Sequence, residues 1–401
     1  MIKKMFLFSI FSLCNILYAL DFTPSIDFSA YGGKYYLDNK SASFDAKLDL
    51  FASYVLNIDE ENQVYPIYSG YYNGTQDIQE LAGGDVLTRQ RMGNSFTLKY
   101  KHSKDFNSIK PRLSYSINRI KETKDEKWGS GLFDYNILSA GVEMEQERPE
   151  ANYKEYFDFF NVDYPNYASL ISQVETVIDT TTYSELSENA GKDVLNSRNY
   201  RAGFSYVKFP YNVVLTNDLS ITYKDFYDQS VVKNPGVGGS IFKSDKRKDL
   251  LFSLSTLLEN TNKKVYLSLG VNLDYLNSNQ NSYDASRTKY ISDFYDYISF
   301  EIYPSAKLNF KNGGYFSYSF TYTRMNYLGR YSQDIDGNYL SSKIRQNFYL
   351  SSLSLAYPVA KNLYAKGVYS YQSVDSNMRY EAGYRYNYNS ESFLIGVEWS
   401  F

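Results

Sequence analysis

The 401-residue sequence has little of what most catalytic and metal sites require, since it contains one histidine and one cysteine. No G-x-S-x-G, P-loop or Cys/His metal motif occurs in it. The histidine, His102, lies beside a predicted short turn, where we expect an ordinary solvated side chain. The cysteine, Cys14, lies in the apolar N-terminal stretch, so the rest of the chain has no disulfide or thiol chemistry. The sequence makes no case for an enzyme, and we expect no catalytic residue, metal site or cofactor.

An excess of charge of one sign is also missing. The 42 basic and 45 acidic side chains leave a net charge of −3, which argues against a nucleic-acid partner. Beyond residue 19 the sequence lacks any apolar run long enough for a transmembrane helix, and its mean hydropathy is −0.47. A helical membrane protein is thereby excluded. A membrane barrel is not, because its strands alternate lipid-facing with lumen-facing residues.

The N-terminal stretch MIKKMFLFSIFSLCNILYA predicts a secretory signal peptide over residues 1–19. Lys3 and Lys4 form its charged start, an apolar core follows, and Ala19 ends a cleavage motif. The apolar run is too short for a comfortable membrane anchor. A lipoprotein signal at Cys14 is disfavoured because the preceding residue is a leucine. We expect cleavage after Ala19 and one domain over residues 20–401, since no linker divides them.

Aromatic residues, by contrast, are abundant, with 44 tyrosines and 26 phenylalanines. Aromatic side chains favour strands, and tyrosine also favours the membrane–water interface. Segments with alternating apolar and polar residues recur, for example SFDAKLDLFASYVLNI from residue 43 and KKVYLSLGVNLDYL from residue 263. These segments reach the length of about 9–11 residues that a tilted transmembrane strand needs. Strands of soluble proteins are shorter, averaging about 5–6 residues.

Short connections alternate with long ones between these segments. The short ones are rich in the Asn, Gly, Pro and Asp of tight turns, and the longest connection covers residues 165–196. This pattern predicts an all-β fold, a transmembrane antiparallel up-and-down barrel with short turns at one end and long loops at the other. We count about sixteen strands, with fourteen or eighteen as alternatives, and parity places both chain ends at the short-turn end. The strands are expected to start near residues 25, 42, 63, 92, 110, 134, 152, 197, 215, 248, 264, 293, 315, 343, 363 and 385.

The last ten residues, SFLIGVEWSF, place apolar side chains at alternate positions and end on an aromatic residue. With the signal peptide and the alternating strands, this resembles Gram-negative outer-membrane β-barrel proteins of porin-like type, without indicating a subfamily. The resemblance implies a place in the bacterial outer membrane, with short periplasmic turns and long extracellular loops. It also implies a C-terminal signal read by the barrel-assembly machinery, formed by Phe393, Ile395, Val397, Trp399 and Phe401.

The 165–196 connection contains two helix-like stretches. In the second, Thr182 and Glu185 have the spacing of a capping box, and Gly191 follows as a stop. The loop could narrow the barrel from inside, stand outside as a partner-binding cap, or cover the mouth. Apolar residues such as Leu170 favour a constriction or a lid, because they need a surface to bury against.

Two other loops carry charged motifs. SQDIDGNYL at 332–340 offers Asp334 and Asp336 but lacks the glutamate that completes a calcium-binding EF-hand, so an ordinary turn is favoured. KSDKRKD at 243–249 clusters basic residues. That cluster could bind phosphates of lipopolysaccharide, or be a plain solvated loop.

The polar phase of each strand predicts the lumen-facing residues. Their acidic and basic side chains are nearly balanced, which predicts weak ion selectivity. Alternatively, these charges pair across strands inside a closed or plugged barrel and serve stability alone. The predicted pore-lining residues are Lys47, Asp49, Lys99, Arg112, Glu143, Arg201, Lys224, Asp274, Glu301 and Lys307.

Taken together, the sequence favours a porin-like channel for passive diffusion of small hydrophilic solutes through a polar lumen narrowed by the 165–196 loop. Its partners would be outer-membrane lipid, lipopolysaccharide and the assembly machinery, and a homo-oligomer would be in keeping with the resemblance. Two alternatives stay open. One is an export or assembly barrel that works with periplasmic partners. The other is a surface-interaction, adhesin-type barrel with a plugged lumen.

Overall fold

The structure, a computed structural model, describes residues 22–38, 40–80, 86–121, 126–167, 193–234, 242–284, 287–381 and 385–401. The predicted signal peptide and the helix-like part of the 165–196 loop lie outside these residues. Within them the chain forms eighteen strands and no helix. It follows that no helix in this part of the chain is long and apolar enough to cross a membrane.

Sixteen of these strands form one closed antiparallel barrel, in which each strand pairs with its neighbours in the chain. The predicted fold class and the predicted number of strands are therefore confirmed. The barrel strands are β1 (Phe22–Leu37), β2 (Lys40–Asn57), β3 (Asn62–Glu80), β4 (Val86–Lys104), β5 (Asn107–Lys121), β6 (Tyr135–Glu147), β7 (Ala151–Asp163), β8 (Ser197–Lys208), β9 (Val213–Val232), β10 (Phe242–Asn260), β11 (Val265–Ser278), β14 (Tyr297–Asn309), β15 (Tyr315–Gln333), β16 (Tyr339–Ala360), β17 (Leu363–Ser376) and β18 (Tyr388–Ser400).

The two remaining strands form a separate hairpin, which the sequence pattern did not predict. They are β12 (Ser282–Asp284) and β13 (Lys289–Ile291), and they lie within the connection expected over 278–292. Several barrel strands also begin earlier than expected, as β10 does at Phe242 rather than 248. At the loop end, pairing continues beyond the length that a membrane requires, so the alternation of lipid-facing residues no longer marks where a strand starts.

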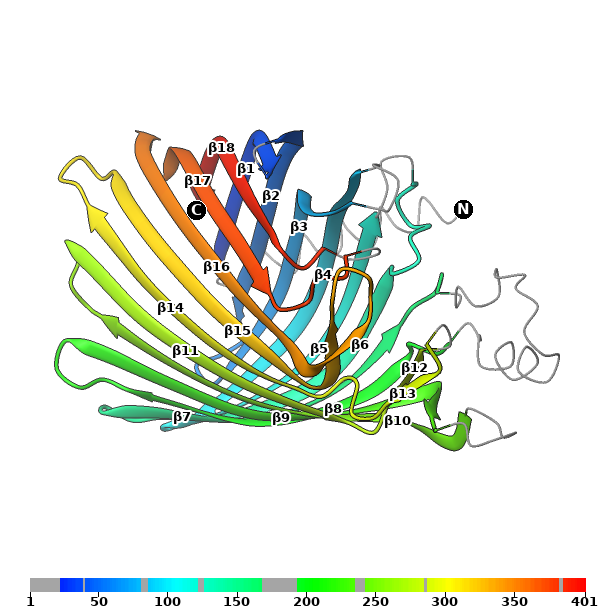
Figure 1. Cartoon of the computed structure of the whole chain (residues 1–401). Helices are drawn as coiled ribbons and strands as arrows, with labels where there is room; N and C mark the ends of the chain where they lie inside the picture. Colours follow the sequence, from blue (N-terminus) through cyan, green and yellow to red (C-terminus); the bar gives the residue numbers. More distant parts are fainter. Residues whose placement is uncertain are drawn as a thin grey trace, which may run out of the picture.

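The ring closes between the first and last strands, which lie side by side in Figure 1. Their register pairs Asp27 with Ser400 and continues to Leu37 opposite Ser390. Closure satisfies backbone groups that an open sheet would leave unpaired at its edge, which a lipid environment does not tolerate. The expected pairing of the C-terminal strand with the region near residues 26–36 is therefore present.

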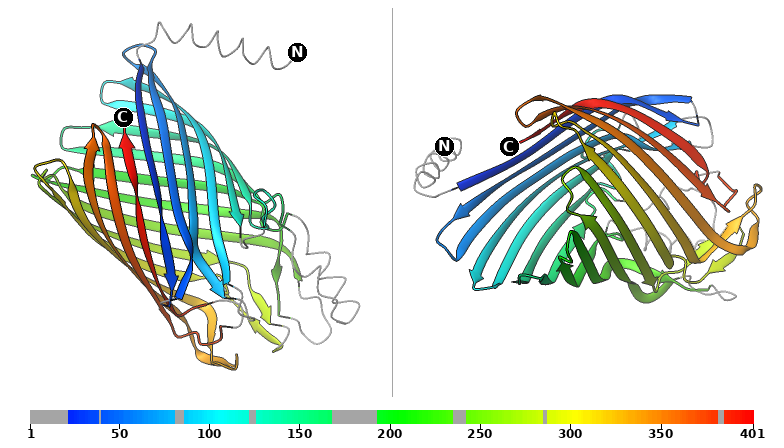
Figure 2. Two further views of the ribbon diagram at one scale, coloured as in Figure 1. Left: turned by 90° about the horizontal axis from the view of Figure 1, so that it is seen from above. Right: turned by 90° about the vertical axis from the view of Figure 1, so that its left-hand side faces the viewer.

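The connections differ between the two ends of the barrel. Tight turns such as 361–362 and 105–106 join strands at one end, and β18 also terminates there. The β12–β13 hairpin belongs to the opposite end (Figure 2, left). We call these the short-turn end and the long-loop end.

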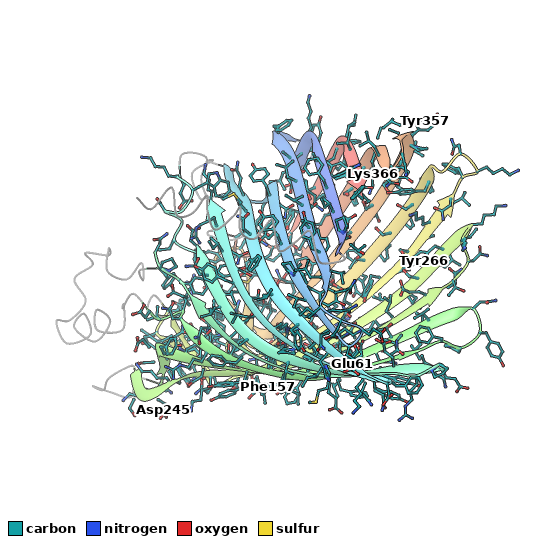
Figure 3. The ribbon with its side chains drawn as sticks, turned by 180° about the vertical axis from the view of Figure 1, so that it is seen from behind. Glu61, Phe157, Asp245, Tyr266, Tyr357 and Lys366 are labelled. Atoms are coloured by element: carbon teal, nitrogen blue, oxygen red, sulfur yellow. The ribbon has the colours of Figure 1, made fainter. Side chains whose placement is uncertain are left out.

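The outward face of the barrel is apolar. Large hydrophobic side chains are exposed along alternate positions of the strands, as with Leu48 and Leu50 on β2 and Phe157 on β7, which is labelled in Figure 3. Exposed rows of this kind are unusual for a protein surrounded by water. A barrel in a bilayer needs such a band on its outer surface.

Candidate functional site: the inner wall of the barrel

The inner face of the barrel is identified by side chains that meet across one or two intervening strands. Arg112 on β5 reaches Asp158 on β7, and Tyr315 on β15 reaches Glu398 on β18. The concave side of a curved sheet brings side chains of non-neighbouring strands together, and most contacts of this kind lie on the face of Arg112 and Asp158. The register then assigns all other positions, because neighbours within one strand point to opposite faces.

All ten predicted pore-lining residues lie on this same inward face. Cross-strand pairs establish it: Lys99 is opposite Arg112, Asp158 opposite Arg201, Asp274 opposite Ser299, and Lys307 opposite Ser317. Several of them pair with one another, as Lys47 does with Asp49 and Lys99 with Glu143. These ten residues are Lys47, Asp49, Lys99, Arg112, Glu143, Arg201, Lys224, Asp274, Glu301 and Lys307.

The densest network on the inner wall centres on Asp158. One carboxylate oxygen accepts from Arg112 Nη2 at 2.6 Å, and the other accepts from Arg201 Nη2 at 2.7 Å. Asp158 lies directly opposite Gly141 in the register, where an added methyl group would overlap its Oδ1. The glycine therefore leaves the space through which Arg112 crosses β6 to reach the carboxylate.

The network presents positive rather than negative charge to the interior. Glu143 contacts Arg112 and accepts from Lys99 Nζ at 3.2 Å. The carboxylates of Glu143 and Asp158 are 9% and 5% exposed, whereas the side chains of Lys99 and Arg201 are 24% and 43% exposed. The acids thus lie beneath the bases. An ion that approaches this part of the wall therefore contacts the cationic groups more than the acidic ones, although acids and bases are nearly equal in number.

A second polar cluster lies where the barrel closes. Lys366 Nζ donates to Glu398 Oε1 at 2.6 Å, Tyr315 donates to Oε2 at 3.0 Å, and Tyr31 also bonds to Glu398. Lys366 extends from β17 and is labelled in Figure 3. Tyr31, Lys366 and Glu398 border a cavity of ≈ 510 Å³ in the inner wall, which Asp45, Lys47 and Asp49 also line. The mixture of acid, base and hydroxyl groups makes this concavity suited to hydrated polar solutes.

The wall half-way around the ring from β6 is rich in small hydroxyl groups. Serines point inward from β11, β14, β15, β16 and β17 and bond to one another across the strands. Examples are Ser268 with Ser305 at 2.6 Å and Ser317 with Ser354 at 2.6 Å. Small side chains occupy little of the interior, so this wall leaves room for water opposite the charged network.

Four inward tyrosines lie over glycines of a neighbouring strand. In each case the tyrosine and the glycine are direct cross-strand partners, and a methyl group on the glycine would overlap the ring. An isolated glycine within a strand is a sequence signal for such a close approach. Which tyrosine lies opposite each glycine depends on the strand register, which the sequence does not give. The pairs are Tyr31–Gly396, Tyr71–Gly93, Tyr156–Gly203 and Tyr303–Gly270.

The remaining candidates from the sequence have ordinary local partners. His102 Nδ1 lies 3.0 Å from Asn62 Oδ1 at the short-turn end. Asp334 accepts the backbone N–H groups of Asp336 and Asn338, and the Asn338 bond is the largest cause of its lowered pKa. No group of three or more His, Cys, Asp or Glu side chains able to hold a metal occurs in the described ranges. In the 243–249 cluster, Arg247 is buried against Asp249 rather than presented to solvent.

The five residues of the expected assembly signal lie on the outward face. Phe393 packs on Tyr369 with ring centroids 4.7 Å apart, and Trp399 stacks on Phe401 at 6.1 Å. Their neighbour Glu398 points inward. The alternation expected for Phe393, Ile395, Val397, Trp399 and Phe401 is thus present, while their recognition by an assembly machinery stays a prediction.

No protein-family model and no curated protein sequence matches this chain. Similar solved structures include the trimer form of OmpT, an outer membrane protein of Vibrio cholerae, at 10% identity over 95% of this chain and 99% of that chain, with a TM-score of 0.47. An anion-selective porin from Comamonas acidovorans has 7% identity over 95% and 100% of the two chains, with a TM-score of 0.47. OccAB1 of Acinetobacter baumannii has 9% identity over 95% and 97%, with a TM-score of 0.43.

Similarities at this level concern the architecture alone and say nothing of the function of this chain. The class defined by the fold is that of closed, sixteen-strand antiparallel barrels with an apolar outer and a polar inner face.

Proposed function

We propose that the protein is an outer-membrane channel through which small hydrophilic solutes diffuse passively. The observation that carries the proposal is the combination of a closed sixteen-strand barrel with a mainly polar inner wall. Barrels of this size enclose an aqueous channel unless loops fill it. The exposed apolar band on the outside supports a position within a bilayer, with the long-loop end toward the cell exterior.

The inner wall favours passage over tight binding. Inward charges are largely neutralised by direct partners, and the small serines keep the interior open. A solute would therefore meet many weak polar contacts and no single strong site, which is what conduction requires. Narrowing of the path by the 165–196 loop remains part of the proposal, although residues 168–192 lie outside the described structure.

The direct test is conductance of the refolded protein in a planar bilayer. We expect stepwise ion currents, and deletion of residues 170–190 should raise the conductance if that loop narrows the path. A barrel that stays silent both with and without those residues would contradict the channel proposal. It would leave the export and surface-interaction alternatives.

Cysteine accessibility gives an internal control, because the chain after residue 19 contains no cysteine. Ser352 points inward and its neighbour Ser351 points outward on the same strand. A charged thiol reagent should lower the current of Ser352→Cys and leave Ser351→Cys unchanged. Equal responses of the two variants would show that current does not pass through the barrel interior.

A further inference from the structure

Two arginines form a basic pair on the outside of the barrel at the long-loop end. Arg324 on β15 is opposite Asn347 in the register, and Arg345 on β16 is opposite Asn326. The arginines are therefore diagonal neighbours, about 7–8 Å apart at their backbones. Both side chains are exposed, and Arg345 is held by a bond from its backbone N–H to Asn377 at 2.8 Å.

These arginines differ from the inward-facing cations of the Asp158 network in lacking acidic partners. Lys99, Arg112 and Arg201 each lie within ion-pair distance of a carboxylate. Among the described residues, no carboxylate lies within 4.0 Å of Arg324 or Arg345. Arg324 Nε donates to Asn326 at 3.3 Å, while Asp375, one strand further along, is 3.5 Å from the Asn347 amide. The pair thus retains donors for an anion.

Below the basic pair, the same two strands carry an aromatic step and then an apolar surface. Tyr322 and Tyr349 pack with ring centroids 5.0 Å apart, and the Tyr322 hydroxyl bonds to Asn347. Further toward the short-turn end lie exposed Tyr318, Phe316, Leu353 and Leu355. Tyrosine marks the membrane–water boundary. From the long-loop end toward the short-turn end, the outer surface of β15 and β16 therefore carries first the two cations, then the interfacial tyrosines, and then the apolar side chains.

We propose that β15 and β16 form a docking surface for a phosphorylated acyl glycolipid of the outer leaflet. The phosphate would be bound by the Arg324 and Arg345 guanidinium groups, whose planar donors suit phosphate oxygens. A sugar hydroxyl would meet the side-chain amide of Asn326, which is partly exposed, and the acyl chains would lie on the apolar surface below. The inference rests on the membrane-spanning orientation of the proposed function but not on conductance, so a silent barrel would leave it intact.

The test is lipid binding to the refolded barrel in neutral detergent, with bisphosphorylated lipid A as the probe and native mass spectrometry as the readout. The Arg324→Gln/Arg345→Gln double variant should lose about tenfold in affinity, since charged hydrogen bonds are the strong ones. Heat-modifiable gel mobility establishes that each variant is folded. An unchanged affinity in the folded double variant would overturn the proposal.

The matched control is Arg198→Gln/Lys248→Gln. These outward cations lie at the same end on β8 and β10, but the register places Asp225 between them. The control should keep its affinity within about twofold, and an equal loss would indicate diffuse charge attraction instead of a site. Dephosphorylated lipid A should bind weakly. Phosphatidylglycerol binding as tightly as lipid A would overturn the assignment to a glycolipid.

Discussion

Phe401, the last residue, exchanges two backbone hydrogen bonds of 2.8 Å with Ile26 of the first strand. Chain ends usually fray, but this one completes the ring of strands. The phenyl ring is 63% exposed on the outward face and stacks on Trp399. The backbone of Phe401 thus extends the β1–β18 pairing that closes the barrel, while its side chain stays available to lipid or to another protein.

Replacing Phe401 with Asp should impair insertion into the membrane. A charge on the outward face at this position loses the stacking on Trp399 and costs free energy in contact with lipid. The measurement is the amount of heat-modifiable, folded barrel in the outer membrane. We expect a several-fold reduction, with Phe401→Trp close to wild type.

Phe106→Asp is the matched control, because Phe106 lies in a tight turn at the same end and is 64% exposed. This variant should assemble normally. If both aspartate variants reach wild-type levels, the C-terminal aromatic residue has no part in assembly.

Gly141→Ala should destabilise the barrel by about 1–3 kcal/mol, the usual cost of inserting a methyl group where no space exists. The methyl would push the Asp158 carboxylate away from Arg112 and Arg201. Urea unfolding in lipid vesicles measures the effect.

Gly367→Ala serves as its control, since a methyl at Gly367 meets no atom within 4 Å. Its midpoint in urea should match that of the wild type. Similar losses for the two variants would mean that glycine flexibility, and not the space above Gly141, matters.

In the Asp158 network the bases are more exposed than the acids beneath them, which predicts a modest preference of the channel for anions. The nearly equal numbers of acidic and basic residues had predicted only weak selectivity. Two unit charges about 4 Å apart in water interact with about 1 kcal/mol. Removing the Arg201 charge from the path of an ion, as in Arg201→Gln, should therefore lower the chloride-to-potassium permeability ratio by a factor of up to about five. The reversal potential in a salt gradient measures this ratio.

Arg198→Gln provides the comparison, since Arg198 is on the same strand but faces outward. It should leave the reversal potential unchanged. A wild-type channel that prefers potassium would refute the reasoning from burial.

The Asp334 turn should loosen on acidification. Hydrogen bonds from the Asn338 and Asp336 N–H groups hold the pKa of Asp334 below its ordinary value. Its contribution to stability is thus present above the unfolded pKa of about 3.9 and is lost as the pH falls through the folded pKa. The Asn338 amide resonance should titrate with a midpoint below about 3.9.

A calcium titration tests the alternative interpretation of this turn, which is that it binds the ion. Because the Asp334 carboxylate already accepts hydrogen bonds from the Asp336 and Asn338 backbone N–H groups, added calcium should not shift the Asn338 resonance. A saturable shift with calcium would favour the ion-binding interpretation of this motif over an ordinary turn.

The sequence was sufficient for the architecture because a strand has a side-chain period of two. Alternation across segments such as 43–58 revealed one face toward lipid and one toward the interior, and the short and long connections indicated how many strands there are. The hairpin β12–β13 was missed because its strands are three residues each, too short for alternation to be visible. The early start of β10 was missed for the reason that its first residues lie beyond the lipid-facing band.

What the sequence by itself determined is therefore the closed sheet, the inward phase of residues such as Lys99 and Arg201, and the outward phase of the C-terminal aromatics. Only the tertiary structure decided that Arg112 reaches Asp158 across Gly141, and that Arg324 and Arg345 are neighbours. The physical reason is that period-two alternation is local, whereas contacts across one or two strands depend on register and on the curvature of the closed barrel.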